Sequence, residues 1–391
     1  MHPVNQAYTY PANPGQGATV YVLDTGLNAS HVDFTGRVRQ GTDMVDNDSN
    51  PADCHGHGTH VAGTAVGTSY GVAKKASVVA VRVLNCQGSG TNDDLIAGIN
   101  WVRTNAQKPA VVNYSIGCQS RCSSQAMDSA VSSLISSGVQ FVQAAGNSSD
   151  DACYYSPQAV AAAVTVGNTN SSDARNGSSN YGSCLDIFAP GTSIVSASYS
   201  SNTGSATMTG TSMASPHTAG AAAVYLRLNP SATPAQVRDA LVNNASTGKV
   251  TSPGSGSPNR LLYTGFMNGG TNPNNPSVTN PGNQSTAVGA SVNLQLQASG
   301  GTVEPLSNSY SMNAVSPCAS IRSKMISAAS SPVPGSDRTR PTRQFRRGCT
   351  LTGACGSSVW KIPTVRDTRS TLARSTCRQT RPRSCRSAPT R

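Results

Sequence analysis

Short runs of apolar residues recur along the first half of the chain, separated by polar turns. They cover residues 19–23, 78–83, 110–113, 139–143 and 163–166. Each run is only four to six residues long and is rich in Val and Ala, which favours buried strands over helices. The pattern predicts five strands.

Longer segments with helical spacing alternate with these strands. They cover residues 58–67, 92–106, 123–137, 212–228 and 234–245. Strands that alternate with helices of ten or more residues indicate an α/β fold, with a mostly parallel central sheet flanked by helices. In such a sheet the chemistry gathers at the carboxyl ends of the strands.

The pattern changes after residue 266, where we place the end of a first domain, 1–266. Residues 267–278 form a polar linker rich in Pro, Gly and Asn. Residues 279–300 contain a stretch, 291–298, that alternates at period two, and they predict the start of a small β-sandwich-like domain. In 302–391, Ser, Thr, Arg and Pro supply 49 of 90 residues and Leu only three. This composition predicts that the tail, 301–391, is disordered.

Charge is concentrated in the same tail. Residues 302–391 hold 16 Lys and Arg against 3 Asp and Glu, whereas the rest of the chain holds 13 against 14. We therefore expect no nucleic-acid binding by the body. The abrupt switch of composition suggests an out-of-frame translation, and a basic tail that binds nucleic acid or anionic surfaces is the alternative. No apolar stretch is long enough to span a membrane.

Cysteines also divide between body and tail. Six of the eleven lie in the body: Cys54, Cys86, Cys118, Cys122, Cys153 and Cys184. An even set indicates disulfides and an oxidising compartment, with six buried thiols in a cytosolic protein as the alternative. The sequence begins without the charged and apolar pattern of a signal peptide.

Three segments carry candidate chemistry. Asp24 ends the first apolar run, His57 lies in a Gly- and His-rich stretch, and Ser212 begins a predicted helix. Alone, each has an ordinary interpretation as a turn, a zinc ligand or a helix cap. Together, in this order, they match a serine nucleophile with a base and an orienting carboxylate.

With these three segments, the chain resembles the subtilisin-like serine peptidases, in particular the proteinase K group and its aqualysin-like secreted bacterial members. The resemblance extends from about residue 8 to residue 263. It rests on the three segments above and on further stretches at 70–74, 80–84, 144–147, 179–184 and 257–262. It implies a subtilisin-like fold.

The resemblance assigns roles to individual residues. Ser212 would be the nucleophile, His57 the general base and then acid, and Asp24 the group that orients His57. Asn147 would be the side-chain donor to the oxyanion of the tetrahedral intermediate.

Substrate-binding segments follow from the same resemblance. Two edge segments would bind a peptide as an added strand, and small residues would wall the pocket for the side chain before the cut. The edges are Gly88, Ser89, Gly90 and Ser115, Ile116, Gly117; the walls are Gly117, Ala144, Ala145 and Gly146. Binding through main-chain hydrogen bonds predicts broad specificity, and small walls leave room for a large apolar or aromatic side chain. Tight backbone packing is the other explanation for these glycines.

Calcium and disulfides are implied as well. Asp186 would bind a structural Ca²⁺ together with the backbone carbonyls of Ala161 and Ala163, or it would be a plain surface residue. The pairs Cys54–Cys86 and Cys153–Cys184 are expected. For Cys118 and Cys122 a local bridge and two free thiols both remain open.

Several positions depart from the family pattern. Cys118 replaces a Gly beside the substrate edge, and Gln143 and Thr218 stand where apolar residues are usual. The expected protein is a secreted, monomeric serine endopeptidase acting on proteins and peptides, and its signal peptide and prosegment are missing from the sequence. The alternative is a catalytically silent binding module with the same fold.

Overall fold

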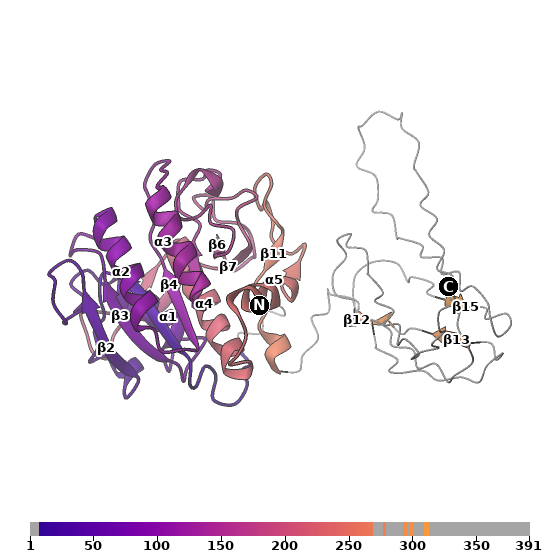
Figure 1. Cartoon of the computed structure of the whole chain (residues 1–391), viewed down its shortest axis with the longest axis horizontal. Coiled ribbons are helices and arrows are strands. Elements are labelled where there is room, and N and C mark those ends of the chain that lie inside the picture. The colour runs from indigo at the N-terminus through magenta and orange to yellow at the C-terminus, as the bar shows by residue number, and fades with distance from the viewer. Residues whose placement is uncertain (1–7, 269–276, 279–291, 296–297, 300–308, 313–391) are drawn as a thin grey trace, which may run out of the picture. The chain divides into compact units, whose positions relative to one another are not determined.

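The structure, a computed structural model, describes residues 8–268, 277–278, 292–295, 298–299 and 309–312. The chain divides into two units: residues 1–276 with 300–302, and residues 277–299 with 303–391. The first unit is built on a nine-stranded sheet with helices on both faces (Figure 1). The predicted α/β fold with a mostly parallel, helix-flanked sheet is confirmed.

All five strands predicted from the apolar runs are present. They are β1 (Thr19–Asp24), β3 (Ser77–Arg82), β4 (Ala110–Tyr114), β5 (Gln140–Ala144) and β6 (Val164–Thr169). The sheet order is β10-β11-β7-β6-β5-β4-β1-β3-β2, and β1 pairs in parallel with β3 on one side and β4 on the other. The chain therefore reverses its direction across the sheet at β1, and such a switch point opens a crevice at the carboxyl ends of the strands.

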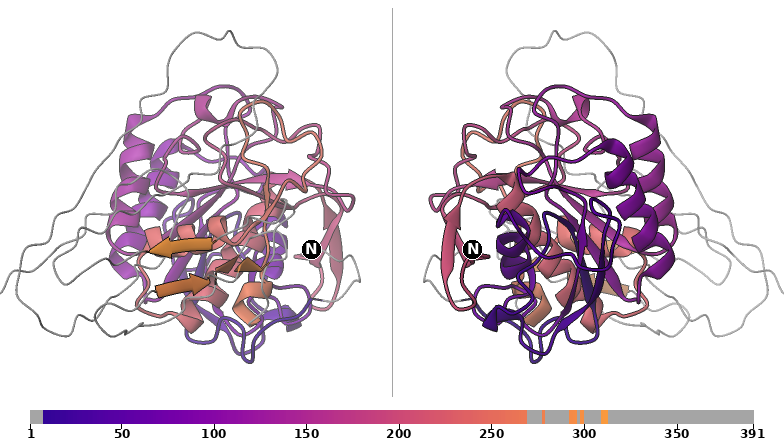
Figure 2. Two further views of the ribbon diagram at one scale, coloured as in Figure 1. Left: turned by 90° about the vertical axis from the view of Figure 1, so that its right-hand side faces the viewer. Right: turned by 90° about the vertical axis from the view of Figure 1, so that its left-hand side faces the viewer.

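Two layers of helices cover the sheet, as Figure 2 shows from both sides. One layer contains α1 (His57–Val66), α4 (Thr211–Leu228) and α5 (Pro234–Asn243); the other contains α2 (Asn92–Asn105) and α3 (Gln125–Ser136). Helix α4 is Ala-rich and buried along most of its length, so it lies close to the strands. This close packing brings the start of α4 to the crevice.

The remaining elements are short and were not predicted. The strands are β2 (Val38–Asp43), β7 (Ile187–Pro190), β8 (Ile194–Ala197), β9 (Ser205–Met208), β10 (Ser246–Thr247) and β11 (Arg260–Leu261); the 3-10 helices are η1 (Val32–Phe34), η2 (Ala152–Tyr154) and η3 (Gly265–Asn268). Strand β2 lies at the sheet edge with its first three residues exposed, so it lacks an apolar run.

In the second unit the structure describes only four short strands. Strand β12 (Ser277–Val278) pairs with β14 (Ala298–Ser299), and β13 (Val292–Gln295) pairs with β15 (Ser309–Met312), both antiparallel. Strand β13 lies in the segment predicted as β-sandwich-like. Strand β15 lies inside the segment predicted as disordered, and the rest of 301–391 is outside the described residues. Within the described residues, no helix is both long and apolar enough to cross a membrane.

Candidate active site

A cleft of about 380 Å³ lies at the carboxyl ends of β1, β4 and β5, next to the start of α4. It brings together segments that are far apart in the sequence. Its lining residues are Thr25, His55, His57, Leu84, Gln87, Gly88, Ser115, Ile116, Gly117, Cys118, Gln119, Ala144, Gly146, Asn147, Ser148, Thr211 and Ser212. Of the four residues to which the sequence analysis gives catalytic roles, three line this cleft and Asp24 lies behind His57.

Asp24 and His57 form a hydrogen-bonded pair. The distance from His57 Nδ1 to Asp24 Oδ1 is 2.7 Å, and the same oxygen accepts the Thr25 backbone N–H at 2.8 Å. Asp24 is fully buried, whereas a fifth of the His57 side chain is exposed. Burial alone would lower the pKa of His57, but the Asp24 carboxylate outweighs it and raises the pKa above its ordinary value.

The start of α1 lies directly against the end of β1 because Gly58 has no side chain. A Cβ on Gly58 would stand 2.2 Å from the backbone oxygen of Gly26 and 3.2 Å from the Asp24 Cβ. The Thr25 hydroxyl also accepts the Gly58 backbone N–H at 2.9 Å. This close approach sets His57 beside Asp24.

Asp53 fastens the same helix start and was missed by the sequence analysis. Its Oδ1 accepts the backbone N–H groups of His55 and Gly56 at 3.0 and 2.8 Å, and its Oδ2 accepts that of Thr59 at 2.9 Å. Burial would raise the pKa of Asp53, but these hydrogen bonds outweigh it and lower the pKa. An Asp just ahead of a predicted helix is an N-terminal signal that could have identified it.

Ser212 is the second residue of α4 and packs against the extension of β4. Its Oγ donates to the backbone oxygen of Ser115 at 3.1 Å. Pro216 has no N–H, so the Ser212 carbonyl lacks its helical partner and instead accepts the Ser115 hydroxyl at 2.8 Å. Two hydrogen bonds therefore hold Ser212 to Ser115 at the cleft.

The Asn147 side chain is oriented by the residue before Ser212. Asn147 Oδ1 accepts the backbone N–H of Thr211 at 2.9 Å and the Thr211 hydroxyl at 3.1 Å. Because the oxygen is held in this way, the Nδ2 donor is left for the cleft that Asn147 lines.

The predicted substrate residues divide into two groups. Gly88, Ser115, Ile116, Gly117, Ala144 and Gly146 line the cleft, whereas Ser89, Gly90 and Ala145 do not. Ser89 and Gly90 are exposed beyond it. Ala145 is fully buried in a cluster with Leu185 and Phe188, so its side chain is no wall of the pocket.

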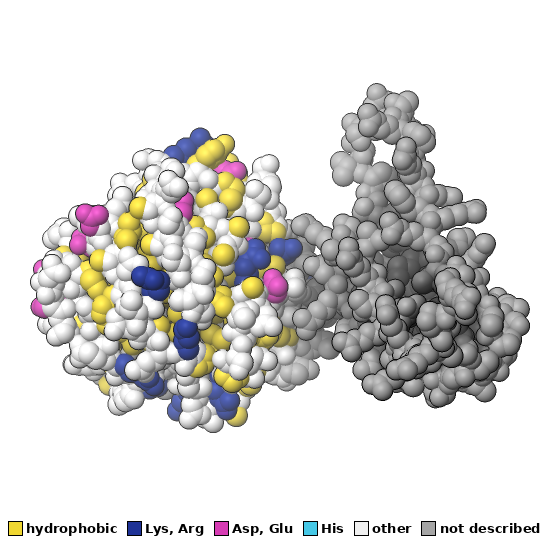
Figure 3. Space-filling view, viewed as in Figure 1, with side chains coloured by type: hydrophobic (Ala, Val, Ile, Leu, Met, Phe, Trp, Pro, Cys, Tyr) yellow, Lys and Arg dark blue, Asp and Glu magenta, His cyan; other side chains and the backbone are white. Residues whose placement is uncertain are grey.

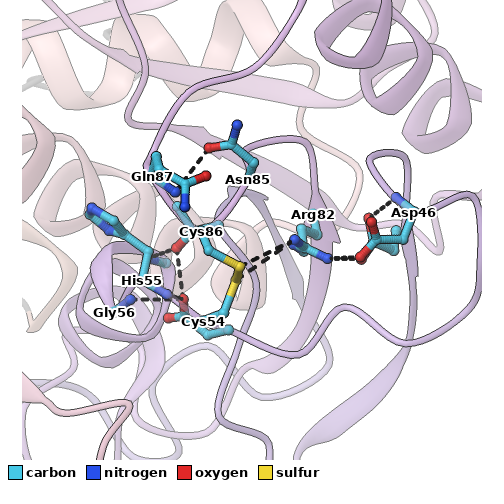
Figure 4. Close-up of a disulfide and its surroundings, with 12 residues drawn as sticks. Asp46, Cys54, His55, Gly56, Arg82, Asn85, Cys86 and Gln87 are labelled. Carbon is cyan, nitrogen blue, oxygen red and sulfur yellow. Dashed lines mark hydrogen bonds and ion pairs between the residues drawn. A yellow bond between two sulfur atoms is a disulfide. The ribbon is translucent and has the colours of Figure 1, made fainter.

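Three disulfides are present. Cys54–Cys86 joins the segment before His57 to the segment after β3, with the Arg82 guanidinium beside its sulfurs (Figure 4). The structure also contains Cys153–Cys184 and Cys118–Cys122. Of the two alternatives for Cys118 and Cys122, a local disulfide or two free thiols, the structure contains the disulfide. Cys118 also lines the cleft.

The Asp186 carboxylate already has a cation beside it. Its Oδ1 pairs with the Arg238 guanidinium and its Oδ2 accepts the Thr165 backbone N–H at 2.9 Å. No group of three or more His, Cys, Asp or Glu side chains suited to a metal occurs among the described residues. The predicted calcium site at Asp186, Ala161 and Ala163 does not fit this arrangement, because the Arg238 guanidinium already pairs with its single carboxylate.

The two polar departures inside the core differ. The Gln143 amide nitrogen donates to the oxygens of Pro157 and Thr165, both at 3.0 Å, while its Oε1 is buried without a partner. The Thr218 hydroxyl has no hydrogen-bond partner within the described part of the chain.

The chain is similar in sequence to a family of known proteins. The sequence pattern of the Subtilase family matches residues 15–265. The chain is 56% identical over 256 residues to alkaline serine exoprotease A of Vibrio alginolyticus, covering 65% of this chain and 47% of that protein. It is 53% identical over 264 residues to an extracellular serine proteinase of a Thermus species, covering 68% of this chain and 63% of that protein. The match thus spans 47% and 63% of the length of these two relatives.

A solved structure is similar as well. The crystal structure of a cold-adapted subtilisin-like serine proteinase is 51% identical to this chain, with a TM-score of 0.64. The similarity covers 67% of this chain and 93% of the other. This likeness supports the fold of the first unit.

Proposed function

Because the chain belongs to the subtilase family, we propose that it is a serine endopeptidase that hydrolyses proteins and peptides. The observation that carries the proposal is the meeting of Ser212, His57 and Asn147 in one cleft, with Asp24 behind His57. A hydroxyl attacks an amide only with a base and an oxyanion donor at hand, and these residues supply both.

In the first half-reaction the Ser212 Oγ rotates away from the Ser115 carbonyl toward His57. Oγ gives its proton to His57 Nε2 and attacks the carbonyl carbon of the peptide bond. Asp24 holds Nδ1 protonated and stabilises the imidazolium that forms. His57 then gives the proton to the leaving amine, which leaves an ester on Ser212.

In the second half-reaction water replaces the amine. His57 takes a proton from the water, which attacks the ester carbonyl, and returns it to Ser212 Oγ as the acid leaves. In both halves the negative oxygen would accept hydrogen bonds from Asn147 Nδ2 and the Ser212 backbone N–H.

The substrate would lie as an extended strand between the segments at 88–90 and 115–117. Such binding uses backbone hydrogen bonds, which favours broad specificity. The side chain before the cut would enter between Gly117 on one side and Ala144 and Gly146 on the other. A preference for large apolar or aromatic side chains requires that the floor between these walls is open.

We place the protein outside the cell, because three disulfides persist in oxidising surroundings and a 53% identical relative is named extracellular. On the face of the first unit seen in Figure 3, Lys and Arg are spread among uncharged side chains. This distribution suits a monomer that binds peptide rather than nucleic acid. Subtilases commonly bind structural calcium, and any such ion here would use residues other than Asp186.

Labelling with a fluorophosphonate probe tests the proposal. We expect one adduct, on Ser212, together with cleavage of casein. Ser212→Ala should lose both while its circular dichroism spectrum is unchanged. A folded protein that neither takes the probe nor cleaves any peptide would be a silent module with this fold, and the proposal would be wrong.

A further inference from the structure

Gln158 is a buried residue beneath the cleft that the proposed reaction does not use. It is 1% exposed and lies in the loop between β5 and β6. Its amide nitrogen donates to the backbone oxygen of Ile116 at 3.1 Å and to that of Ala144 at 3.0 Å. One side chain therefore uses both of its N–H groups to join the two segments that wall the pocket.

The position of this amide follows from the sheet. Strands β4 and β5 pair as far as Tyr114 and Gln143, and their extensions separate beyond that point. Ile116 and Ala144 lie just past the last pair, and the carbonyl of each accepts a hydrogen bond from the Gln158 amide. The Gln158 amide therefore links the two strand extensions by hydrogen bonds where the backbone pairing of β4 and β5 has ended.

Gly117, Gly146 and the Gln158 amide lie close together at the inner end of the pocket. A Cβ on Gly117 would stand 3.7 Å from Gln158 Nε2 and 4.0 Å from the Gly146 Cα. Both values are ordinary van der Waals distances, so a methyl group on Gly117 would touch Gln158 and Gly146 at once. Small walls alone predict a deep pocket, but here the Gln158 side chain joins the two wall segments behind the residues that line the cleft.

We propose that Gln158 is the floor of the pocket for the side chain before the cut and limits it to small residues, of about the size of alanine. This inference rests on the proposed peptidase function. It replaces the expectation that large apolar or aromatic side chains are preferred. That expectation was based on the small residues of the walls and did not include Gln158. Gln158 is a specificity residue, because it sets the depth of the pocket without taking part in bond breaking.

A series of peptide substrates that differ only in the residue before the cut tests the proposal. For the full-length protein we expect kcat/KM to be at least ~10-fold higher with Ala than with Phe, since one carbon group in a pocket changes rates about 10- to 200-fold. Gln158→Ala should reverse or abolish this preference by opening the floor. Gln158→Met, which keeps the bulk but not the hydrogen bonds, should retain it.

Gln143→Leu is the matched control. Gln143 is also a buried glutamine, but its amide donates to Pro157 and Thr165 and not to the walls. Its substitution should change the melting temperature and leave the Ala-to-Phe ratio unchanged.

Two results would overturn the proposal: a wild-type protein that prefers Phe, or a Gln158→Ala variant that labels at Ser212 with an unchanged ratio. If Gln158→Ala does not fold, the wild-type ratio alone decides. Failure of the peptidase function itself is distinguishable, because then neither substrate is cleaved and Ser212 takes no probe.

Discussion

The protonation of His57 decides when the cleft can react. Asp24 raises the pKa of this ring, and only the neutral ring can accept the Ser212 proton. We therefore expect kcat/KM to fall on the acid side with a midpoint above the ordinary histidine value of about 6.5. A pH series on one small peptide measures it, with circular dichroism at each pH to show that the fold persists.

The variant Asp24→Asn tests the effect of the Asp24 charge on His57 without changing the other residues of the cleft. The amide keeps the shape but not the charge, so the acid midpoint should move to lower pH. In a serine peptidase of another fold the same change lowers kcat about 10⁴-fold, and we expect a loss of that order. A midpoint that stays in place would show that Asp24 does not control His57.

Asn147 permits a second test at this scale. Asn147→Ala removes a donor that binds only the developing oxyanion, so kcat should fall and KM should change little. The expected loss is about 10²–10³-fold, a magnitude taken from a subtilisin, which belongs to the same family. Thr211→Ala should cause a smaller loss, because Thr211 only orients the amide. A rise in KM with an unchanged kcat would assign Asn147 to substrate binding instead.

At the scale of elements, the start of α1 depends on Asp53. Its Gly56 cap has no side chain, so the Asp53 carboxylate satisfies the exposed backbone N–H groups. Asp53→Asn replaces one accepting oxygen by an NH2 group, so a backbone N–H loses its acceptor and the free energy of unfolding should fall by about 1–3 kcal/mol at pH 7. Urea unfolding measures it, with Asp93→Asn in the first turn of α2 as the control.

The effect of Asp53 has a defined sign with pH. The pKa of Asp53 is lower in the folded protein, so its stabilisation is complete above the unfolded value of about 3.9. It is lost as the pH falls through the folded value. The difference between wild type and Asp53→Asn should therefore shrink below pH 3.9, and a constant difference would contradict the assignment.

The pair of Asp186 and Arg238 gives a prediction about calcium. Asp186 bonds to Arg238 of α5 and to the backbone of β6, so it ties a helix to the sheet without an ion. Asp186→Asn should lower the melting temperature by the same amount in excess Ca²⁺ and in excess EGTA. If the variant instead removes a calcium-dependent rise of the wild-type melting temperature, Asp186 is a calcium ligand after all.

Which elements could be predicted from the sequence depends on how much of each is buried. The strands β1, β3, β4, β5 and β6 are covered on both faces, so each forms a continuous apolar run. Strand β2 is half exposed and β7 ends in a Pro, and neither produces such a run.

The candidate site shows the same limit for single residues. Asp24, His57 and Ser212 lie in motifs with a known order and could be predicted. Gln158 acts by joining two segments that lie 42 and 14 residues away in the sequence, and no local pattern records that geometry. Asp186 and Arg238 are farther apart still, at 52 residues.

At the scale of the whole molecule, every residue of the cleft lies before the division at residue 276. The first unit nevertheless uses residues beyond 264 for its core. Met267 is buried, and the Phe266 ring lies 6.3 Å from that of Tyr225 in α4, the helix that carries Ser212. The stability of a shortened chain therefore depends on whether it keeps Phe266 and Met267, although a chain that ends anywhere after residue 212 still contains all the reacting residues.

Two truncations separate these contributions. A chain that ends at residue 276 should keep the melting temperature, the labelling of Ser212 and the kcat of the full chain. A chain that ends at residue 264 loses Phe266 and Met267 from the core beside α4, and loss of one such buried side chain destabilises by about 2–5 kcal/mol. Its melting temperature should fall, and its activity should disappear at a lower temperature. A loss of activity already at residue 276 would mean that the segment after it, including the basic tail, contributes to the peptidase.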